Sequence, residues 1–115
     1  MTSSLLNQPL LVVTNVPQQA LADAMARSLV EQGLAACVNI LPPVASVYRW
    51  QGQVEQASEI PLLIKTTQAR YQELEQAILR AHPYEVPEIV ALPLATGLPA
   101  YLAWMQHETA KPVQA

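Results

Sequence analysis

Prolines and glycines limit every regular element that this 115-residue chain can form, because ten prolines and three glycines are spread along it. A proline lacks a backbone N–H, so it interrupts helices and is excluded from the middle of a sheet. Each segment between these residues has room for a short strand or a helix of a few turns. The chain has the length of one domain.

The apolar pattern predicts which of these segments are strands. Short β-branched runs and alternating apolar runs are typical of strands, and they occupy residues 10–14, 35–41, 45–51, 53–66 and 88–94. Gly52 makes the turn of a long hairpin. Pro61 and Pro93 lie inside two of the strand segments, and we expect a bulge or a sheet edge at each.

Helices are predicted where apolar residues recur every three or four positions. The first covers residues 18–32 and stops at Gly33, the second covers residues 67–82 with Thr67 as its N-cap, and the third starts at Pro99. The resulting order is βαββαβ, an α+β ferredoxin-like domain with a long β-hairpin extension and a C-terminal helix. We expect it to span residues 10–109, with flexible termini at 1–9 and 110–115.

Composition restricts the partners of such a domain. Hydrophobic residues make up 51% of the chain and charged residues only 13%, against about 25% charged in an average soluble domain. So little charge cannot cover a small domain, which indicates that it is an oligomer. The six basic residues are scattered, so nucleic acid is not an expected partner. No long apolar run or signal peptide is present, so we expect a cytoplasmic protein without a membrane partner.

The densest polar segment is His82-Pro83-Tyr84-Glu85-Val86-Pro87-Glu88. Its prolines stiffen a loop that presents an imidazole, a phenol and two carboxylates, which suits ligand binding. Imidazole and carboxylate oxygen would also suit a divalent metal ion, with His82 and Glu85 as ligands. The alternative is that His82 caps the preceding helix and Glu85 is solvated.

Three further residues are candidates for a binding site. Tyr48 and Trp50 share a strand face near Glu55 and Glu59, either as the wall of a ligand pocket or as ordinary cross-strand packing. Lys65 ends an apolar strand, where it could anchor an anion, pair with Glu88 or Glu59, or extend into solvent.

Motifs for several enzyme classes are missing. The sequence has no Gly-rich phosphate loop, no His-Glu-x-x-His, no Gly-x-Ser-x-Gly and no Cys-x-x-Cys. The single cysteine, Cys37, excludes an intramolecular disulfide and is expected to be an inert core thiol, and His107 a surface residue. An acylphosphatase would need a glycine-bearing loop after the first strand, and residues 14–19 contain no glycine or arginine.

Taken together, the sequence resembles the divalent-cation tolerance (CutA) family. The matching motifs are Leu34-Ala35-Ala36-Cys37-Val38-Asn39-Ile40, Ser46-x-Tyr48-x-Trp50-x-Gly52, Glu59-x-x-Leu62-Leu63-Ile64-Lys65-Thr66-Thr67, His82-Pro83-Tyr84-Glu85-Val86-Pro87-Glu88-Ile89 and Tyr101-Leu102-x-Trp104. The match runs in order from about Leu11 to Trp104.

The resemblance implies a non-catalytic homotrimer related in architecture to PII-type signalling trimers. It also implies binding of copper or another divalent cation, which folding would not require. Some members carry a cysteine where this chain has Thr14 and a second histidine where it has Ala81, and of that ligand set only His82 is present.

Two functions therefore remain open. One is a metal-binding protein with His82 and Glu85 as ligands. The other is a PII-like ligand-sensing or interaction trimer, whose inter-subunit cleft binds a small molecule through Tyr48, Trp50, Lys65, Tyr84 and Glu88.

Overall fold

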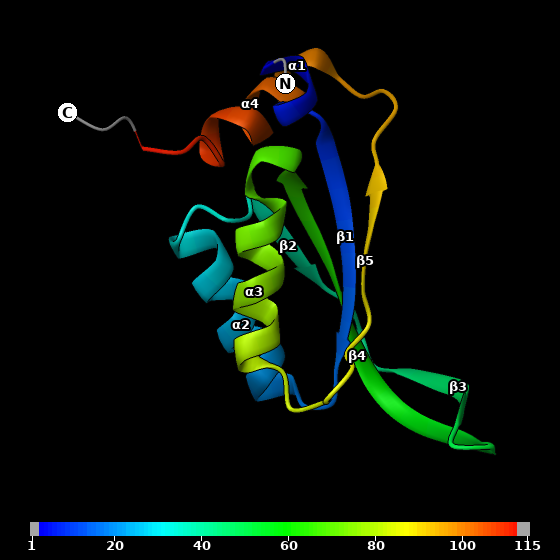
Figure 1. Cartoon of the computed structure of the whole chain (residues 1–115). Coiled ribbons are helices and arrows are strands. Elements are labelled where there is room, and N and C mark those ends of the chain that lie inside the picture. The colour runs from blue at the N-terminus through cyan, green and yellow to red at the C-terminus, as the bar shows by residue number, and fades with distance from the viewer. Residues whose placement is uncertain (1–2, 113–115) are drawn as a thin grey trace.

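The structure is a computed structural model that describes residues 3–112. It contains a five-stranded antiparallel sheet and four α-helices in an α+β arrangement (Figure 1). The elements are α1 (Ser3–Leu6), β1 (Pro9–Val16), α2 (Gln19–Glu31), β2 (Cys37–Ile40), β3 (Val44–Trp50), β4 (Gln53–Thr67), the 3₁₀ turn η1 (Gln68–Arg70), α3 (Tyr71–Ala81), β5 (Ile89–Pro93) and α4 (Pro99–Glu108).

The sheet has the strand order β2-β4-β1-β5, and β3 pairs with β4 outside this row. Strand β1 lies between β4 and β5 and pairs with both, so the first and last strands of the βαββαβ order are neighbours. This topology confirms the predicted ferredoxin-like fold. The β3–β4 hairpin extends well away from the body (Figure 1).

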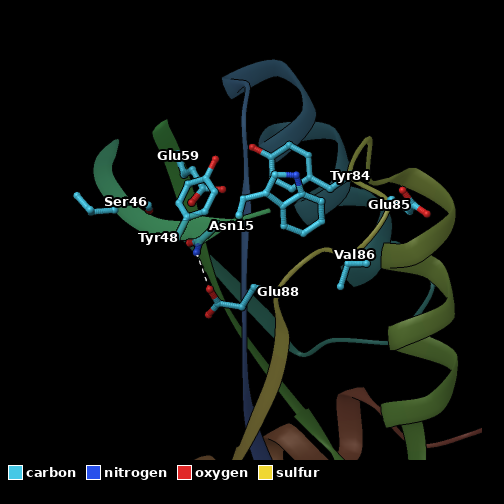
Figure 2. Close-up of a pocket in the computed structure, with 10 residues that line it drawn as sticks. Asn15, Ser46, Tyr48, Glu59, Tyr84, Glu85, Val86 and Glu88 are labelled. Atoms are coloured by element: carbon cyan, nitrogen blue, oxygen red, sulfur yellow. Dashed lines mark hydrogen bonds between the residues drawn. The ribbon is translucent and has the colours of Figure 1, made fainter. Parts of the chain in front are cut away.

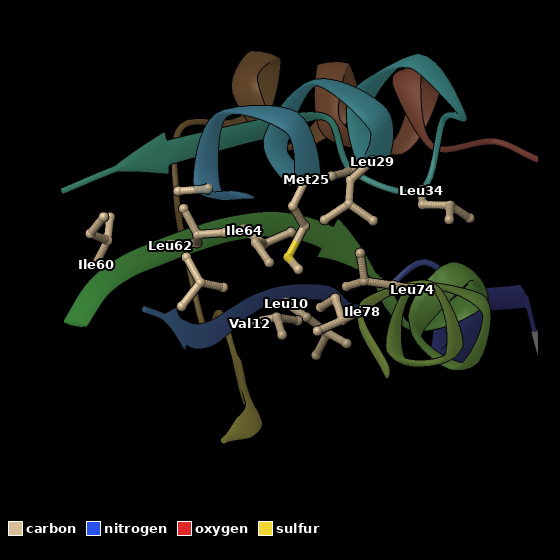
Figure 3. Packing of buried hydrophobic residues seen from close by; sticks show 13 residues of the cluster. Leu10, Val12, Met25, Leu29, Leu34, Ile60, Leu62, Ile64, Leu74 and Ile78 are labelled. Carbon is tan, nitrogen blue, oxygen red and sulfur yellow. The ribbon is translucent and has the colours of Figure 1, made fainter. Parts of the chain in front are cut away.

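The hydrophobic core lies between the sheet and one layer of helices. Helices α2 and α3 cover a single face of the sheet (Figure 1), and alternate residues of β1 and β4 point toward them. Figure 3 shows this packing, in which fully buried side chains from both layers include Val12, Leu62, Ile64, Leu74 and Ile78. The prediction that Cys37 is a core thiol was wrong, because it lies half-buried in β2, outside this cluster.

The two predicted helix boundaries lie at the expected positions. Gly33 ends α2 as expected, with a φ of +70° that suits glycine and an N–H that donates to the carbonyl of Val30 at 3.0 Å. Thr67, the last residue of β4, is the N-cap residue of η1, which leads into α3, so its predicted position is confirmed. Its side chain makes no capping hydrogen bond, and its hydroxyl lies 3.2 Å from that of Thr109 instead.

Pro61 and Pro93 both lie within strands of the sheet, and each has a position that tolerates the missing N–H. Pro93 ends the edge strand β5, as predicted. Pro61 lies inside β4, between the point where β2 stops pairing and the point where β3 starts. Its carbonyl accepts from Leu41 at 3.0 Å, so its nitrogen faces the same side, and the missing N–H leaves the pairing of β4 with β1 uninterrupted.

The other face of the sheet carries no layer of helices over most of its area (Figure 1). Val13 lies there between Leu63 and Val90 in the register, and Leu11 lies between Lys65 and Leu92. Only α4 reaches one end, where the Lys65 Nζ lies 5.8 Å from the ring centre of Tyr101. Val90 and Leu92 are about half exposed, at 49% and 50%. We call this surface the open face.

The chain ends are described in part. The N-terminal segment, expected to be flexible, forms the short helix α1, and Gln8 next to it donates to the carbonyl of Leu94 at 3.2 Å. The predicted C-terminal tail is described to Pro112, and residues 113–115 lie outside the described part. Within residues 3–112, no helix has the length and apolar character needed to cross a membrane.

Candidate functional site

A pocket of about 510 Å³ opens where the base of the hairpin meets the loop between α3 and β5. It continues the open face, because Asn15 and Glu59 belong to that side of β1 and β4. Figure 2 shows its lining, which consists of Asn15, Ser46, Val47, Tyr48, Trp50, Glu59, Tyr84, Glu85, Val86 and Glu88.

His82 fixes the loop that forms one wall of this pocket. Its ring is buried, with Nε2 2.7 Å from the carbonyl oxygen of Asn15. Its Nδ1 accepts the backbone N–H of Tyr84 at 3.1 Å, so the proton resides on Nε2, which donates to Asn15. The ring also contacts that of Tyr84, at 4.7 Å between centroids. His82 therefore ties the loop to the end of β1.

Three carboxylates line the pocket, each in a different environment. Glu88 Oε1 accepts from Asn15 Nδ2 at 3.0 Å, which holds it at the mouth (Figure 2). Glu85 is exposed on the loop. Glu59, on β4, is only 9% exposed. In residues 3–112 no ion pair joins any of the three to a basic side chain, and the lining contains no lysine or arginine.

Three aromatic rings face the same space from two elements. Tyr48 and Trp50 come from one face of β3, and Tyr84 comes from the loop. Burial raises the pKa of the Tyr84 phenol, and the nearby Glu59 carboxylate and Tyr48 raise it further. The Tyr84 hydroxyl, Glu59 and Tyr48 are therefore close enough to interact electrostatically.

The structure brings most of the predicted site residues together. Tyr48, Trp50, Tyr84, Glu85 and Glu88 all line the pocket. The expected cleft residue Lys65 does not, because it lies six positions beyond Glu59 along β4 and under the ring of Tyr101.

The two expected metal ligands, His82 and Glu85, lie in different environments, because only Glu85 lines the pocket. Both ring nitrogens of His82 already have hydrogen-bond partners, and His82 is not part of the pocket lining. Thr14 is fully buried, and its Oγ1 has no hydrogen-bond partner. Among residues 3–112, no three histidine, cysteine, aspartate or glutamate side chains are grouped closely enough to hold a metal ion.

Ser46, Val47 and Val86 also line the pocket without having been predicted, and Asn15 is the unpredicted lining residue that lies farthest along the chain from the loop it contacts. It ends an apolar strand and lies 73 positions from Glu88, to which it donates. Its one local signal is a polar side chain among the apolar residues of β1.

Known proteins are similar to this chain in both sequence and fold. The CutA1 divalent ion tolerance protein family matches residues 10–108. The divalent-cation tolerance protein CutA of Thermus thermophilus is 48% identical over 98 residues, covering 85% of this chain and 95% of that protein. Protein CutA of the mouse is 42% identical over 93 residues, which cover 81% of this chain and 52% of its own length.

The solved structure of the Thermus thermophilus divalent cation tolerance protein superposes with a TM-score of 0.87 at 46% identity, covering 89% of this chain and 99% of that one. The chain thus spans nearly all of the bacterial relative and about half of the mouse relative. The chain belongs to the CutA1 divalent ion tolerance protein family.

Proposed function

We propose that this chain is a non-catalytic binding protein, which assembles as a homotrimer and holds a divalent metal ion, copper or another, at the loop side of the pocket. The observation that carries this proposal is the lining itself, which has three carboxylates and no basic side chain. Carboxylates, phenol hydroxyls and an amide make up most of its polar groups, and oxygen ligands of this kind suit the binding of a cation.

The loop-side ligands that we propose are Glu85 and Glu88. Both carboxylates are exposed at the mouth, and neither is engaged by a cation in the described part of the chain. His82 would have to give up its bond to Asn15 before it could coordinate a metal. Because two carboxylates are a sparse ligand set, we expect water or a neighbouring subunit to complete the coordination.

Calorimetric titration with Cu²⁺ tests the metal site. The paired variant Glu85→Gln with Glu88→Gln keeps the shape of both side chains and removes their charge, so we expect affinity to fall about tenfold or more. Glu31→Gln, an exposed glutamate at the end of α2, is the matched control and should bind like the wild type. Unchanged affinity in the paired variant would refute the site.

The open face supports the homotrimer. It places Leu11, Val13, Leu63, Val90 and Leu92 in adjacent strands of one surface without a covering helix layer. A large apolar patch of this kind is typical of subunit interfaces. Closed cyclic assembly would bury these residues and bring neighbouring hairpins beside the pocket.

Light scattering tests the assembly directly. The chain has a mass of 12.6 kDa, and we expect three times this mass at micromolar concentration. A monomer mass would contradict the homotrimer. We also propose a cytoplasmic location, which fractionation of the source cells tests.

A second candidate function is a PII-like ligand-sensing trimer. The observation that favours it is the gathering of Tyr48, Trp50 and Tyr84 around one space, since aromatic rings are typical of small-molecule sites. In this second function the pocket binds an organic ligand, and the hairpin changes its interaction with a partner when the ligand is bound.

A further inference from the structure

Glu59 is a buried carboxylate beside the Tyr84 hydroxyl, and among residues 3–112 no counter-charge accompanies it. It is nine-tenths buried, lines the pocket, and has no basic side chain within ion-pair distance in the part of the chain that the structure describes. Taking a carboxylate out of water is costly unless a partner compensates it. A ligand that entered the pocket with a positive charge would provide this compensation.

The surroundings of Glu59 favour one kind of cation. The rings of Tyr48, Trp50 and Tyr84 line the same pocket and are 44%, 48% and 40% exposed in the single chain, so none is fully packed by its own chain. Aromatic faces attract cations, and they do so most effectively when the cation carries alkyl groups that also bury apolar surface. Figure 2 shows Glu59 and Tyr48 on the side of the pocket opposite Glu85.

A bare metal ion is a poorer fit on this side. It requires several oxygen, nitrogen or sulfur ligands close together. Among residues 3–112 no such group of three side chains occurs. An organic ammonium ion needs one carboxylate and ring faces, which the hairpin side of the pocket supplies. The volume of about 510 Å³ also lies within the usual range for small-molecule sites.

We propose that the hairpin side of the pocket binds a small organic ammonium ion, with the ammonium group between the Glu59 carboxylate and the rings of Tyr48, Trp50 and Tyr84. This inference rests on the second candidate function and names its ligand class. It leaves the loop-side carboxylates Glu85 and Glu88 for the proposed metal ion.

Calorimetric titration of the intact protein with choline tests this inference, with 3,3-dimethylbutan-1-ol as the neutral probe of the same shape. We expect choline to bind at least about tenfold more tightly than the alcohol, because only choline carries the charge. Glu59→Gln should weaken choline binding about tenfold or more and leave the weak binding of the alcohol unchanged. Trp50→Leu should weaken choline binding about fivefold or more.

Two matched controls report whether these losses are specific to the pocket. Glu31→Gln removes one carboxylate charge on α2, and Trp104→Leu removes the other tryptophan, on α4. Neither residue lines the pocket, so both variants should bind choline as the wild type does. Circular dichroism of each variant shows that the fold is retained.

The outcomes separate this inference from the proposed metal function. Equal binding of choline and the alcohol, no choline binding, or full binding by Glu59→Gln would each overturn the inference. If choline fails while Cu²⁺ binds and requires Glu85 and Glu88, the metal proposal stands alone. If choline binds with the expected variant pattern and Cu²⁺ does not, the inference stands and the metal proposal fails.

Discussion

Replacing His82 with alanine tests whether this residue anchors the loop or binds a metal. The wild-type ring donates to the carbonyl of Asn15 at 2.7 Å and accepts from the N–H of Tyr84 at 3.1 Å. Alanine removes both bonds and leaves two polar groups near a buried space. Each lost bond contributes about 1 kcal/mol, and each unsatisfied partner adds a desolvation cost, so we expect a total of about 2–4 kcal/mol.

Urea denaturation measures this loss, at one fixed protein concentration because subunit association contributes to stability. His107→Ala is the control, since the His107 side chain is 85% exposed and its loss should change stability by less than about 0.5 kcal/mol. Near-ultraviolet circular dichroism should also change in His82→Ala, because Tyr84 loses its ring contact.

A single result would refute the anchoring role. If His82→Ala keeps its stability within about 0.5 kcal/mol while its affinity for Cu²⁺ falls tenfold or more, then His82 is a metal ligand. If instead stability falls and Cu²⁺ affinity is retained, the loop is held by His82 and the metal by other groups.

Three further predictions concern the open face and the pocket. Lys65→Ala should lower the thermal midpoint and Lys65→Met less, because methionine keeps an apolar side chain beside the Tyr101 ring that alanine removes, and equal, negligible losses would show a solvated lysine. Val90→Asp places a charge on the open face, so light scattering should detect dissociation toward the 12.6 kDa monomer, and an unchanged mass would contradict the interface. The raised pKa of Tyr84 means that the folded state holds the phenol proton more tightly than the unfolded state, so the free energy of unfolding falls as pH rises from 10.0 through the raised value. Glu59→Gln should shift the phenol titration, followed by absorbance, back toward 10.0, and an unmoved titration would show that Glu59 has no influence.

The elements of the fold followed from local signals in the sequence. The end of α2 was predictable because Gly33 can adopt a positive φ, and the edge position of Pro93 because proline has no N–H to donate. The position of Thr67 at the start of the helical segment η1–α3 was also predictable, but the partner of its side chain was not. Its hydroxyl lies beside that of Thr109, 42 positions away in the chain, and makes no capping hydrogen bond.

The pocket was predictable where one element supplied it and unpredictable where several met. Tyr48 and Trp50 share a face because side chains alternate along a strand. Lys65 lies outside the pocket of its own chain, because six positions of extended strand separate it from Glu59 by about 20 Å, and its place in a cleft between subunits stays a prediction. Asn15 was missed because only the β1–β5 pairing brings it to Glu88.

The length of β4 has a mechanical consequence for the hairpin. Its 15 residues form one unbroken strand, with the hairpin at one end and the central sheet at the other. A force on the hairpin tip, from a ligand or a neighbouring molecule, is therefore transmitted as bending and twisting of a single continuous strand. At Pro61 the strand changes its partner from β2 on the sheet side to β3 on the hairpin side, while Asn15 of β1 stays opposite it. Glu59 lies two residues from this point, so a displacement of the hairpin would also move this wall of the pocket.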